Sequence, residues 1–434
     1  MTLSSNLPTD IYMGSTPLKN RKSRWTAFFN GDPVIWIVFF ILCAISIIEV
    51  YSATSTLSYK DGLYWRPVIN HSIYLLLGFL VVFVFHNIPC RWFKLYPLLM
   101  IPISVILLLL VPFVGEKVNG AQRVIPIMGI PVQPSELAKG AVVVAVALIL
   151  SVMQTPKGAD RHAFKYIMIP TSLVCLLIAP DNFSTAAILF IVVFMMMFVG
   201  HIPFRQLGSL LGILAIVGAS VVGLMFVTPN NQLGKIPKGH RLVTWKNRID
   251  KFVSNKDENT RELSAKDFDM TNNAQVGNAN IAIATSNIVG KLPGNSVQRD
   301  FLSQAYSDFI YAIIIEELGL IGSAGVLMLY IILCYRAGRI ARQCERNFPA
   351  FLVIGLSLLI VFQAMINMCV AVGLMPVTGQ PLPFVSRGGA STLVNSIYIG
   401  MILSVSRFAK KREDTPAVSS AVNEEAFHDE NGIS

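Results

Sequence analysis

The stretch KLPGNSVQRDFLSQAYSDFIYAIIIEELG, residues 291–319, decides how the rest of the chain is organised. Its polar first part ends at Asp308, and the apolar run that begins with Phe309 predicts a long helix. That helix carries two further acids, Glu316 and Glu317. A carboxylate in hydrocarbon costs about 2.5–3.5 kcal/mol on insertion scales, so acids in membrane segments are candidates for functional groups.

Asp308 has two interpretations on these residues alone. It precedes Glu316 by eight residues, which corresponds to about 12 Å of helix rise. In the first interpretation Asp308 is an interfacial acid that stays in contact with water at the mouth of a helix. In the second it faces a polar cavity and takes part in chemistry there.

The composition of the chain is that of a membrane protein with several spans. Of its 434 residues, 53% are hydrophobic and only 14% are charged, and the mean hydropathy is +0.59. The apolar residues come in blocks long enough to cross a bilayer as helices. The net charge of +10 is therefore interpreted through membrane topology rather than as a nucleic-acid signal. The six cysteines show neither metal-ligand spacing nor a disulfide framework.

The expected fold is an all-α polytopic membrane protein with ten transmembrane helices. A large extracytoplasmic loop, residues 229–306, separates the seventh span from the eighth. A cytoplasmic N-terminal arm (1–32) precedes the membrane domain (33–408), and a disordered cytoplasmic tail (409–434) follows it. The spans are predicted at about 33–54, 70–87, 95–114, 134–153, 165–180, 184–200, 207–228, 307–335, 350–372 and 388–408.

Basic residues set the predicted orientation. An even number of spans puts both termini on one side of the membrane. The N-terminal arm, the short loops on that side and the segment after the last span carry far more lysines and arginines than the short loops on the other face, so both ends are predicted to be cytoplasmic. Residues with this role include Lys19, Arg21, Lys22, Arg24, Arg91, Lys94, Lys157, Arg161, Lys165, Arg205, Arg336, Arg339, Arg342, Arg346, Arg407, Lys410, Lys411 and Arg412. No cleavable signal pattern precedes the first span.

Two further segments carry charge near the predicted membrane. Glu136 and Lys139 are three residues apart and share a helix face just inside the fourth span. They fit either a site or an ion pair that only holds two helices together. In the large loop, HRLVTWKNRIDKFV at 240–253 has the pattern of an amphipathic helix on the outer membrane surface. Its alternative role is to present Arg241 to an anionic phosphate.

Irregular backbone is predicted between the last two spans. Residues 373–391, GLMPVTGQPLPFVSRGGAS, contain three prolines and forbid a continuous helix. Non-helical backbone at membrane depth is tolerated only where it is buried in protein or lines a wet cavity. At the turn between spans five and six, Asp181 is interpreted as a capping residue of the sixth span.

These motifs together resemble the SEDS family (shape, elongation, division and sporulation) over nearly the whole span region. GNSVQ at 294–298 is similar to the cell-division branch of that family. The other motifs are VYSAT at 50–54, NGAQR at 119–123, QPSELAK at 133–139, PDNFSTA at 180–186, SDFIYAIIIEELG at 307–319 and PVTGQPLPFVSRGG at 376–389.

The resemblance implies a ten-helix fold and an enzyme that polymerises glycan strands from lipid II in the bacterial cytoplasmic membrane, at the division septum. It implies a complex with a class B penicillin-binding protein and other membrane proteins of the division machinery, and no nucleic-acid partner. The family's essential aspartate corresponds to Asp308. Its substrate-contacting motif residues correspond to Glu136, Lys139, Arg123, Gln298 and Ser386.

Three positions depart from the family pattern. Val124 stands where a tryptophan is usual, and Arg387 stands where a tyrosine is usual. SNIVGKLPG replaces the glycine-rich approach to the GNS motif. None of these changes removes the acid. They bear on how the substrate is held, and Arg387 is a candidate substitute contact for an anion.

The chemistry of lipid II polymerisation assigns roles to these residues. A carboxylate can take the proton of the acceptor hydroxyl, and Asp308 is the candidate base. Positive charge must meet the leaving diphosphate, from Lys139, Arg123, Arg241 and Arg387 in that order of preference. A divalent cation, Mg²⁺ or Mn²⁺, is the alternative source of that charge, and no other cofactor is implied. A lipid II flippase that uses the same acids is the competing function, although Asp308 lies at the outer mouth rather than at the midplane, where carrier sites lie.

Overall fold

The structure of the protein is a computed structural model, and it describes residues 29–53, 66–118, 121–127, 130–156, 158–227, 246, 270–302 and 306–413. All elements below belong to the unit that begins at Gly31. Four predicted features lie wholly or mostly outside the described residues: the N-terminal arm, most of the surface helix at 240–253 together with Arg241, most of the large loop before residue 270, and the tail beyond Glu413.

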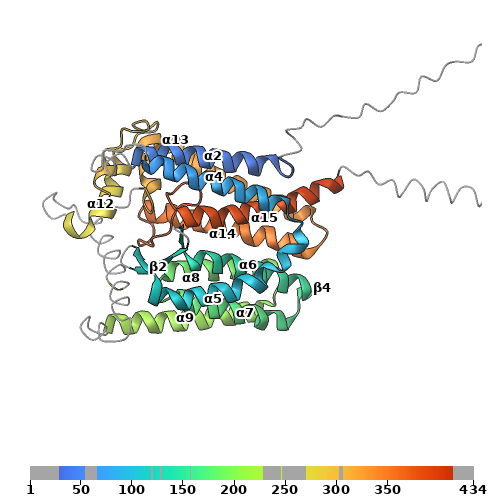
Figure 1. The fold of residues 1–434 in the computed structure, drawn as a ribbon. Coiled ribbons are helices and arrows are strands. Elements are labelled where there is room, and N and C mark those ends of the chain that lie inside the picture. Colours follow the sequence, from blue (N-terminus) through green and yellow to red (C-terminus); the bar gives the residue numbers. More distant parts are fainter. Residues whose placement is uncertain are drawn as a thin grey trace, which may run out of the picture. The chain divides into compact units, whose positions relative to one another are not determined.

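Long apolar helices dominate the described part of the chain (Figure 1). Eight are long and apolar enough to cross a membrane, which confirms a helical polytopic architecture. The shorter helices α8 (Phe183–Val199) and α9 (Phe204–Val227) coincide with the predicted sixth and seventh spans. The eight are α2 (Pro33–Ala53), α4 (Arg66–Asn87), α5 (Tyr96–Val114), α6 (Pro134–Val152), α7 (Arg161–Ile178), α13 (Ile310–Gln343), α14 (Asn347–Ala371) and α15 (Gly389–Glu413).

Three of these helices, α6, α14 and α15, form the centre of the bundle. α6 packs against α5, α7, α8 and α14, and α14 also packs against α13 and α15. The most apolar windows of α6 and α15 are 72% and 78% buried, whereas that of α5 is 17% buried. Small residues allow the close approach, since a Cβ on Gly140 would lie 2.4 Å from the ring of Tyr398 on α15. Large apolar side chains on α4 and α5 point outward, as expected for surfaces that face lipid.

Short strands replace helix where the sequence predicts irregular backbone. β1 (Glu116–Val118), β2 (Ala121–Ile127) and β3 (Ile130–Val132) form an antiparallel sheet in that order. Ile125 pairs with Val132 in its register. Pro134 follows in the first turn of α6, where its missing N–H costs nothing. At the opposite end of the bundle, β4 (Gln154–Thr155) pairs with β5 (Gly158–Ala159) (Figure 1).

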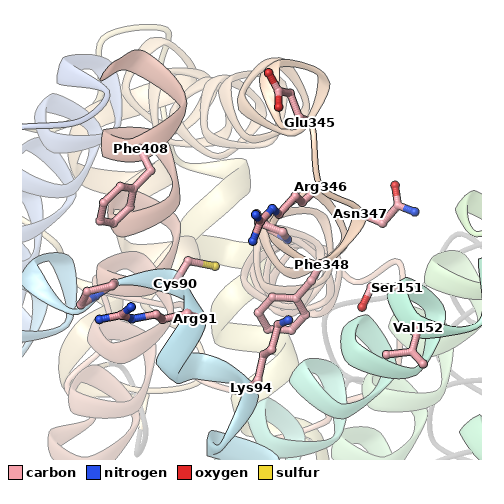
Figure 2. Close-up of a pocket in the computed structure, with 12 residues that line it drawn as sticks. Cys90, Arg91, Lys94, Ser151, Val152, Glu345, Arg346, Asn347, Phe348 and Phe408 are labelled. Carbon is pink, nitrogen blue, oxygen red and sulfur yellow. The ribbon is translucent and has the colours of Figure 1, made fainter. Parts of the chain in front are cut away.

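The two ends of the bundle differ in character. Asp308, the β1–β3 sheet and α12 (Met270–Ala284) lie at one end. At the other end, a cavity of about 760 Å³ opens between η1 (Cys90–Lys94), the end of α6 and the start of α14 (Figure 2). This cavity therefore does not adjoin Asp308.

The long helix α13 is broken near its start. Gly319 has φ +70° and ψ −169° and interrupts the helical backbone. The segment 288–298, here called the strap, pairs with α13 at this break. The Lys291 N–H donates to the Glu316 carbonyl at 3.0 Å, and the Leu292 N–H donates to the Glu317 carbonyl at 2.8 Å. Two glycine backbones meet here, so the break needs glycine for both its φ and its space.

Gly319→Ala is expected to destabilise the protein by about 2–4 kcal/mol. A Cβ at this position would lie 2.4 Å from Gly290 N and 2.4 Å from Ile288 O, which are backbone atoms. Thermal unfolding of purified protein in detergent measures the effect. Gly325→Ala is the matched control on the same helix, because a Cβ there meets nothing within 4 Å. An equal response of the two variants would contradict the close packing of the strap on Gly319.

Candidate functional site

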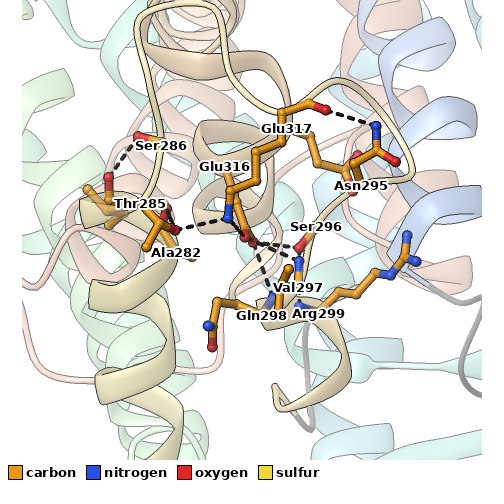
Figure 3. Close-up of polar contacts among 12 residues, drawn as sticks. Ala282, Thr285, Ser286, Asn295, Ser296, Val297, Gln298, Arg299, Glu316 and Glu317 are labelled. Carbon is orange, nitrogen blue, oxygen red and sulfur yellow. Dashed lines mark hydrogen bonds and ion pairs between the residues drawn. The ribbon is translucent and has the colours of Figure 1, made fainter.

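A buried carboxylate, Glu316, holds the strap against α13 (Figure 3). Its oxygens accept from Lys291 Nζ at 2.7 Å and from Ser296 Oγ at 2.5 Å. They also accept from the backbone N–H groups of Val297 at 3.2 Å and Gln298 at 3.4 Å. The charge of Glu316 is thus met by one cation and three hydrogen-bond donors of the GNSVQ motif. This cluster therefore fixes the strap to α13 at Glu316, which is eight residues after Asp308 in the sequence.

The turn that carries Asp308 is held by the loop between α14 and α15. Ser386 Oγ donates to the Ser307 carbonyl at 2.6 Å, and the Arg387 N–H donates to the Tyr306 carbonyl at 2.9 Å. Asn367 Nδ2 on α14 donates to the carbonyl of Asp308 itself at 3.0 Å. Asp308 is 7% exposed. The position of Asp308 therefore depends on hydrogen bonds to its backbone turn from α14 and from the loop between α14 and α15, and not only on the start of α13.

Two opposite charges approach the same backbone position, Gly379. A Cβ built on Gly379 would lie 3.5 Å from Asp308 Oδ2 and 3.6 Å from Arg123 Nη1. Gly379 has φ +67°, a conformation that glycine adopts without strain. Arg123 comes from β2 and Asp308 from the turn before α13. The sheet and the loop therefore bring a guanidinium and a carboxylate to one point at this end of the bundle.

Lys139 lies in a separate, fully buried cluster. Its Nζ is 2.8 Å from Glu136 Oε1 and donates to Gln363 Oε1 at 2.9 Å. Gln363 in turn donates from Nε2 to the Pro381 carbonyl at 3.2 Å. The structure thus shows Glu136 and Lys139 as an ion pair inside the bundle. The cluster ties α6 to α14 and to the same irregular loop that holds Asp308.

The turn between α7 and α8 is capped by a residue other than the predicted one. Asn182, and not Asp181, is the N-cap of α8, and its Oδ1 accepts from the Thr185 N–H at 3.3 Å. An N-cap side chain must reach the N2 or N3 amide, and Asp181 is one residue too early for that contact. Gln380 Nε2 donates to Thr185 Oγ1 at 2.8 Å, so this turn also supports the loop.

The predicted site residues fall into three groups. Asp308, Arg123, Ser386 and Arg387 belong to the turn and loop around residue 308. Arg387 lies with its guanidinium 5.4 Å from the centre of the Tyr306 ring. Glu136 and Lys139 form the buried cluster behind that loop, whereas Gln298 belongs to the strap, where its backbone contacts Glu316. The eighth, Arg241, lies outside the described residues.

Polar residues within apolar spans were missed by the sequence reasoning. Gln363 and Asn367 are four residues apart on one face of α14 and support the loop and the Asp308 turn. That spacing of amides in an apolar helix was a readable signal. Glu49, the only acid in α2, is fully buried and was missed in the same way.

The described residues around Asp308 contain no cluster of side chains that could by itself hold a metal ion. Within the ranges that the structure describes, no group of three or more His, Cys, Asp or Glu side chains could hold a metal ion. The positive charge beside Asp308 comes from Arg123.

The fold and the buried charges define a polytopic helical membrane protein with an acid-centred site at one end. Among solved structures, a chain of a peptidoglycan synthase complex that coordinates polymerization and crosslinking is similar with a TM-score of 0.66. The match has 23% identity and covers 87% of this chain and 98% of the other. The rod shape determining protein RodA of Thermus thermophilus is similar with a TM-score of 0.59 and 23% identity, over 87% of this chain and 97% of RodA.

Sequence comparison identifies the family. The family of the cell cycle proteins FtsW, RodA and SpoVE matches residues 32–411. A probable peptidoglycan glycosyltransferase FtsW of Haemophilus influenzae is 31% identical over 406 residues, which are 89% of this chain and 94% of the relative. That of Halomonas elongata is 29% identical, over 84% of this chain and 88% of the relative. The chain belongs to the FtsW, RodA and SpoVE family.

Lys139→Ala is expected to lower the free energy of unfolding by about 3–5 kcal/mol, because it leaves the carboxylate of Glu136 buried without its cation. Thermal or denaturant unfolding of the purified protein measures the loss. The double variant Glu136→Gln with Lys139→Met is the control, and it should be clearly more stable than Lys139→Ala because no buried charge remains. Unchanged stability of Lys139→Ala would contradict the buried ion pair.

Proposed function

We propose that the protein is a peptidoglycan glycosyltransferase that polymerises lipid II into β-1,4 glycan strands during cell division. Relatives called peptidoglycan glycosyltransferase FtsW match most of the chain. The observation that carries the residue assignment is the approach of Asp308 and Arg123 to one backbone position, Gly379. A base and a cation at one point are what glycosyl transfer from a lipid diphosphate needs.

Asp308 acts as the general base in this proposal. Its carboxylate takes the proton of the acceptor hydroxyl as that oxygen attacks the anomeric carbon of the donor. The bond from that carbon to the lipid diphosphate breaks, and the diphosphate leaves with the bonding electron pair. Attack from the far side of the donor converts the α-linked sugar into a β-1,4 linkage. A positioned base contributes about 10²–10⁴-fold to such a step.

Arg123 is the preferred contact for the leaving diphosphate. A guanidinium can bind phosphate through two parallel hydrogen bonds. Arg387 and Arg241 stay as further candidates. Lys139 was first in the order derived from the sequence, but it is fully buried and already bonded to Glu136 and Gln363. We therefore assign Lys139 to positioning the loop 372–388.

The orientation that supports this function has Asp308 on the extracytoplasmic side and both termini in the cytoplasm at the septum. The ten-span topology, with α8 and α9 as spans six and seven, and an outer loop between α9 and α13 are part of the same proposal. The short connections at the end of the bundle opposite Asp308 carry more basic residues than the short connections at the Asp308 end, as expected for a cytoplasmic face. Lipid II in the outer leaflet would then reach Asp308 directly.

Cysteine labelling tests this orientation. In a variant whose six native cysteines are replaced by serine, a cysteine at Asp300 should react with a membrane-impermeant maleimide added to intact cells. A cysteine at Arg342 should react only after the membrane is opened. Both positions are exposed, so access to the reagent depends on the side of the membrane. Labelling at 342 but not at 300 in intact cells would reverse the orientation.

The proposed partner is a class B penicillin-binding protein that cross-links the new strands, alongside other membrane proteins of the division machinery. The similar solved structure of a peptidoglycan synthase complex supports an assembly of this general kind. Apolar helix faces that point outward give such a partner a surface for close helix packing. Polymerisation is therefore assayed with and without a partner of this class.

Asp308→Asn tests the assignment of the base. The variant keeps shape and polarity, so it should fold and bind lipid II but polymerise it at least about a hundredfold more slowly than the wild type. Glycan length on gels with purified protein and lipid II is the measurement. Asp300→Asn is the matched control, because Asp300 is an exposed acid of the same outer segment and its loss should leave the rate unchanged.

The remaining outcomes separate the alternatives. An interfacial or capping Asp308 predicts only a mild effect, since Asn caps a helix about as well as Asp. A flippase predicts that wild-type protein makes no glycan and that lipid II translocation in vesicles fails in Asp308→Asn. Polymer made by the Asp308→Asn variant at the wild-type rate would remove Asp308 as the base.

A further inference from the structure

The cavity of about 760 Å³ at the end opposite Asp308 takes no part in the proposed chemistry. Four segments distant in sequence surround it: the turn and η1 around residues 89–94, the end of α6, the α13–α14 connection with the start of α14, and the end of α15. Figure 2 shows Arg91 and Lys94 on one side and Arg346 on another, around the opening.

Positive charge around this cavity is not neutralised by the described part of the chain. Arg91, Lys94 and Arg346 line the cavity, and none of them forms an ion pair with a carboxylate among the described residues. Lys94 Nζ lies 5.6 Å from the centre of the Phe348 ring, and the Arg91 guanidinium lies 5.8 Å from that of Trp92. Both charged groups thus lie within cation–π distance of an aromatic ring, a contact that holds them in place but does not neutralise their charge.

The backbone adds to this positive potential. α14 begins at Asn347 on the cavity wall, and no side chain caps its first N–H groups. A helix start favours a negative charge by its dipole and its free N–H groups. Glu345 is the single acid among the lining residues. Three cations and a helix start outweigh it, so the cavity favours an anion.

The other walls of the cavity are apolar. Phe348 and Phe408 line it together with Val152 and two prolines. Val152 is 74% exposed and Phe408 is 42% exposed. A free inorganic anion would meet the cations but leave these apolar surfaces uncovered. A molecule with a phosphate next to hydrocarbon would satisfy both parts of the lining.

We infer that this cavity binds one anionic phospholipid, with its phosphate among Arg91, Lys94 and Arg346 and an acyl chain against Val152 and Phe408. Basic pockets between transmembrane helices at the cytoplasmic side suit such headgroups. The leaflet follows from the orientation proposed above, whereas the site itself depends on neither the orientation nor the polymerase activity. A lipid here ties together the ends of α6, α14 and α15, the three central helices.

Lipid titration of the full-length protein tests the site. Native mass spectrometry in a neutral detergent counts bound molecules of phosphatidylglycerol and, separately, of phosphatidylcholine. We expect one saturable site for phosphatidylglycerol. The triple variant Arg91→Gln, Lys94→Gln, Arg346→Gln should bind it at least about tenfold more weakly, because it removes the three positive charges that attract the lipid phosphate.

A matched variant separates a site from general surface charge. Lys165→Gln, Arg205→Gln, Arg339→Gln removes the same charge from exposed residues at the same end of the bundle but outside the cavity lining. It should keep the affinity of the wild type. Equal weakening in both triple variants would overturn the proposal, as would equal binding of phosphatidylcholine. If the first triple variant does not fold, Arg346→Gln is compared with Arg339→Gln.

Two other occupants are tested in the same system. Inorganic phosphate or glycerol phosphate that competes as strongly as phosphatidylglycerol would show a free-anion site and overturn the lipid assignment. The acidic end of the chain is the other possible occupant. If neutralising its acids raises the affinity for phosphatidylglycerol at least about tenfold, that segment fills the cavity and the lipid is not its resident ligand. Those acids are Glu424, Glu425, Asp429 and Glu430.

Discussion

The buried carboxylate of Glu316 is the interaction on which the Asp308 end of the bundle depends. An ionised acid inside a membrane protein is unfavourable unless its charge and lone pairs are met. Here one lysine, one hydroxyl and two backbone N–H groups meet them. All of these donors come from the strap, so the strap cannot leave α13 without leaving the buried carboxylate of Glu316 without its partners. The chain thereby attaches an irregular segment to a membrane helix at one defined register.

A second set of contacts makes the loop 372–388 rigid without regular structure. Amide side chains on helices bond to its carbonyl groups: Gln363 to Pro381, and Asn367 to Gln380. Proline residues have no N–H to satisfy, which reduces the number of donors that need partners in this buried loop. The same loop then donates to the Tyr306 and Ser307 carbonyls next to Asp308. The position of Asp308 therefore depends on contacts made by α14 as well as on the start of α13.

Hydropathy and proline positions predicted the helices well because those signals are local. Each predicted span overlaps a helix of the structure, with most edges displaced by a few residues and the end of α13 by eight, and Pro134 begins α6 as expected. The break at Gly319 was not predicted. The run IYAIIIEELGLIG around it reads as continuous apolar helix, and only the strap that pairs with it explains the break.

The candidate site was predictable as a set of residues but not as an arrangement. Asp308 and Arg123 are distant in sequence, and their approach to Gly379 depends on how the sheet and the loop pack. Lys139 illustrates the limit, since its spacing from Glu136 predicts a pair equally on an exposed or a buried face. Its complete burial with Gln363 is a property of the assembled bundle. The cap at Asn182 was missed by one residue, because neighbouring Asp and Asn are both good caps.

The distance along the chain between Asp308 and the strap contact has a consequence for insertions and deletions. The short helical segment from Ile310 to Leu318 joins Asp308 to Glu316 and ends at the break. Removing or adding one residue within it would turn Asp308 by about 100° around the helix axis while the strap kept Glu316 in place. Natural variants of this protein should therefore tolerate changes of apolar residue type in this segment but preserve its length.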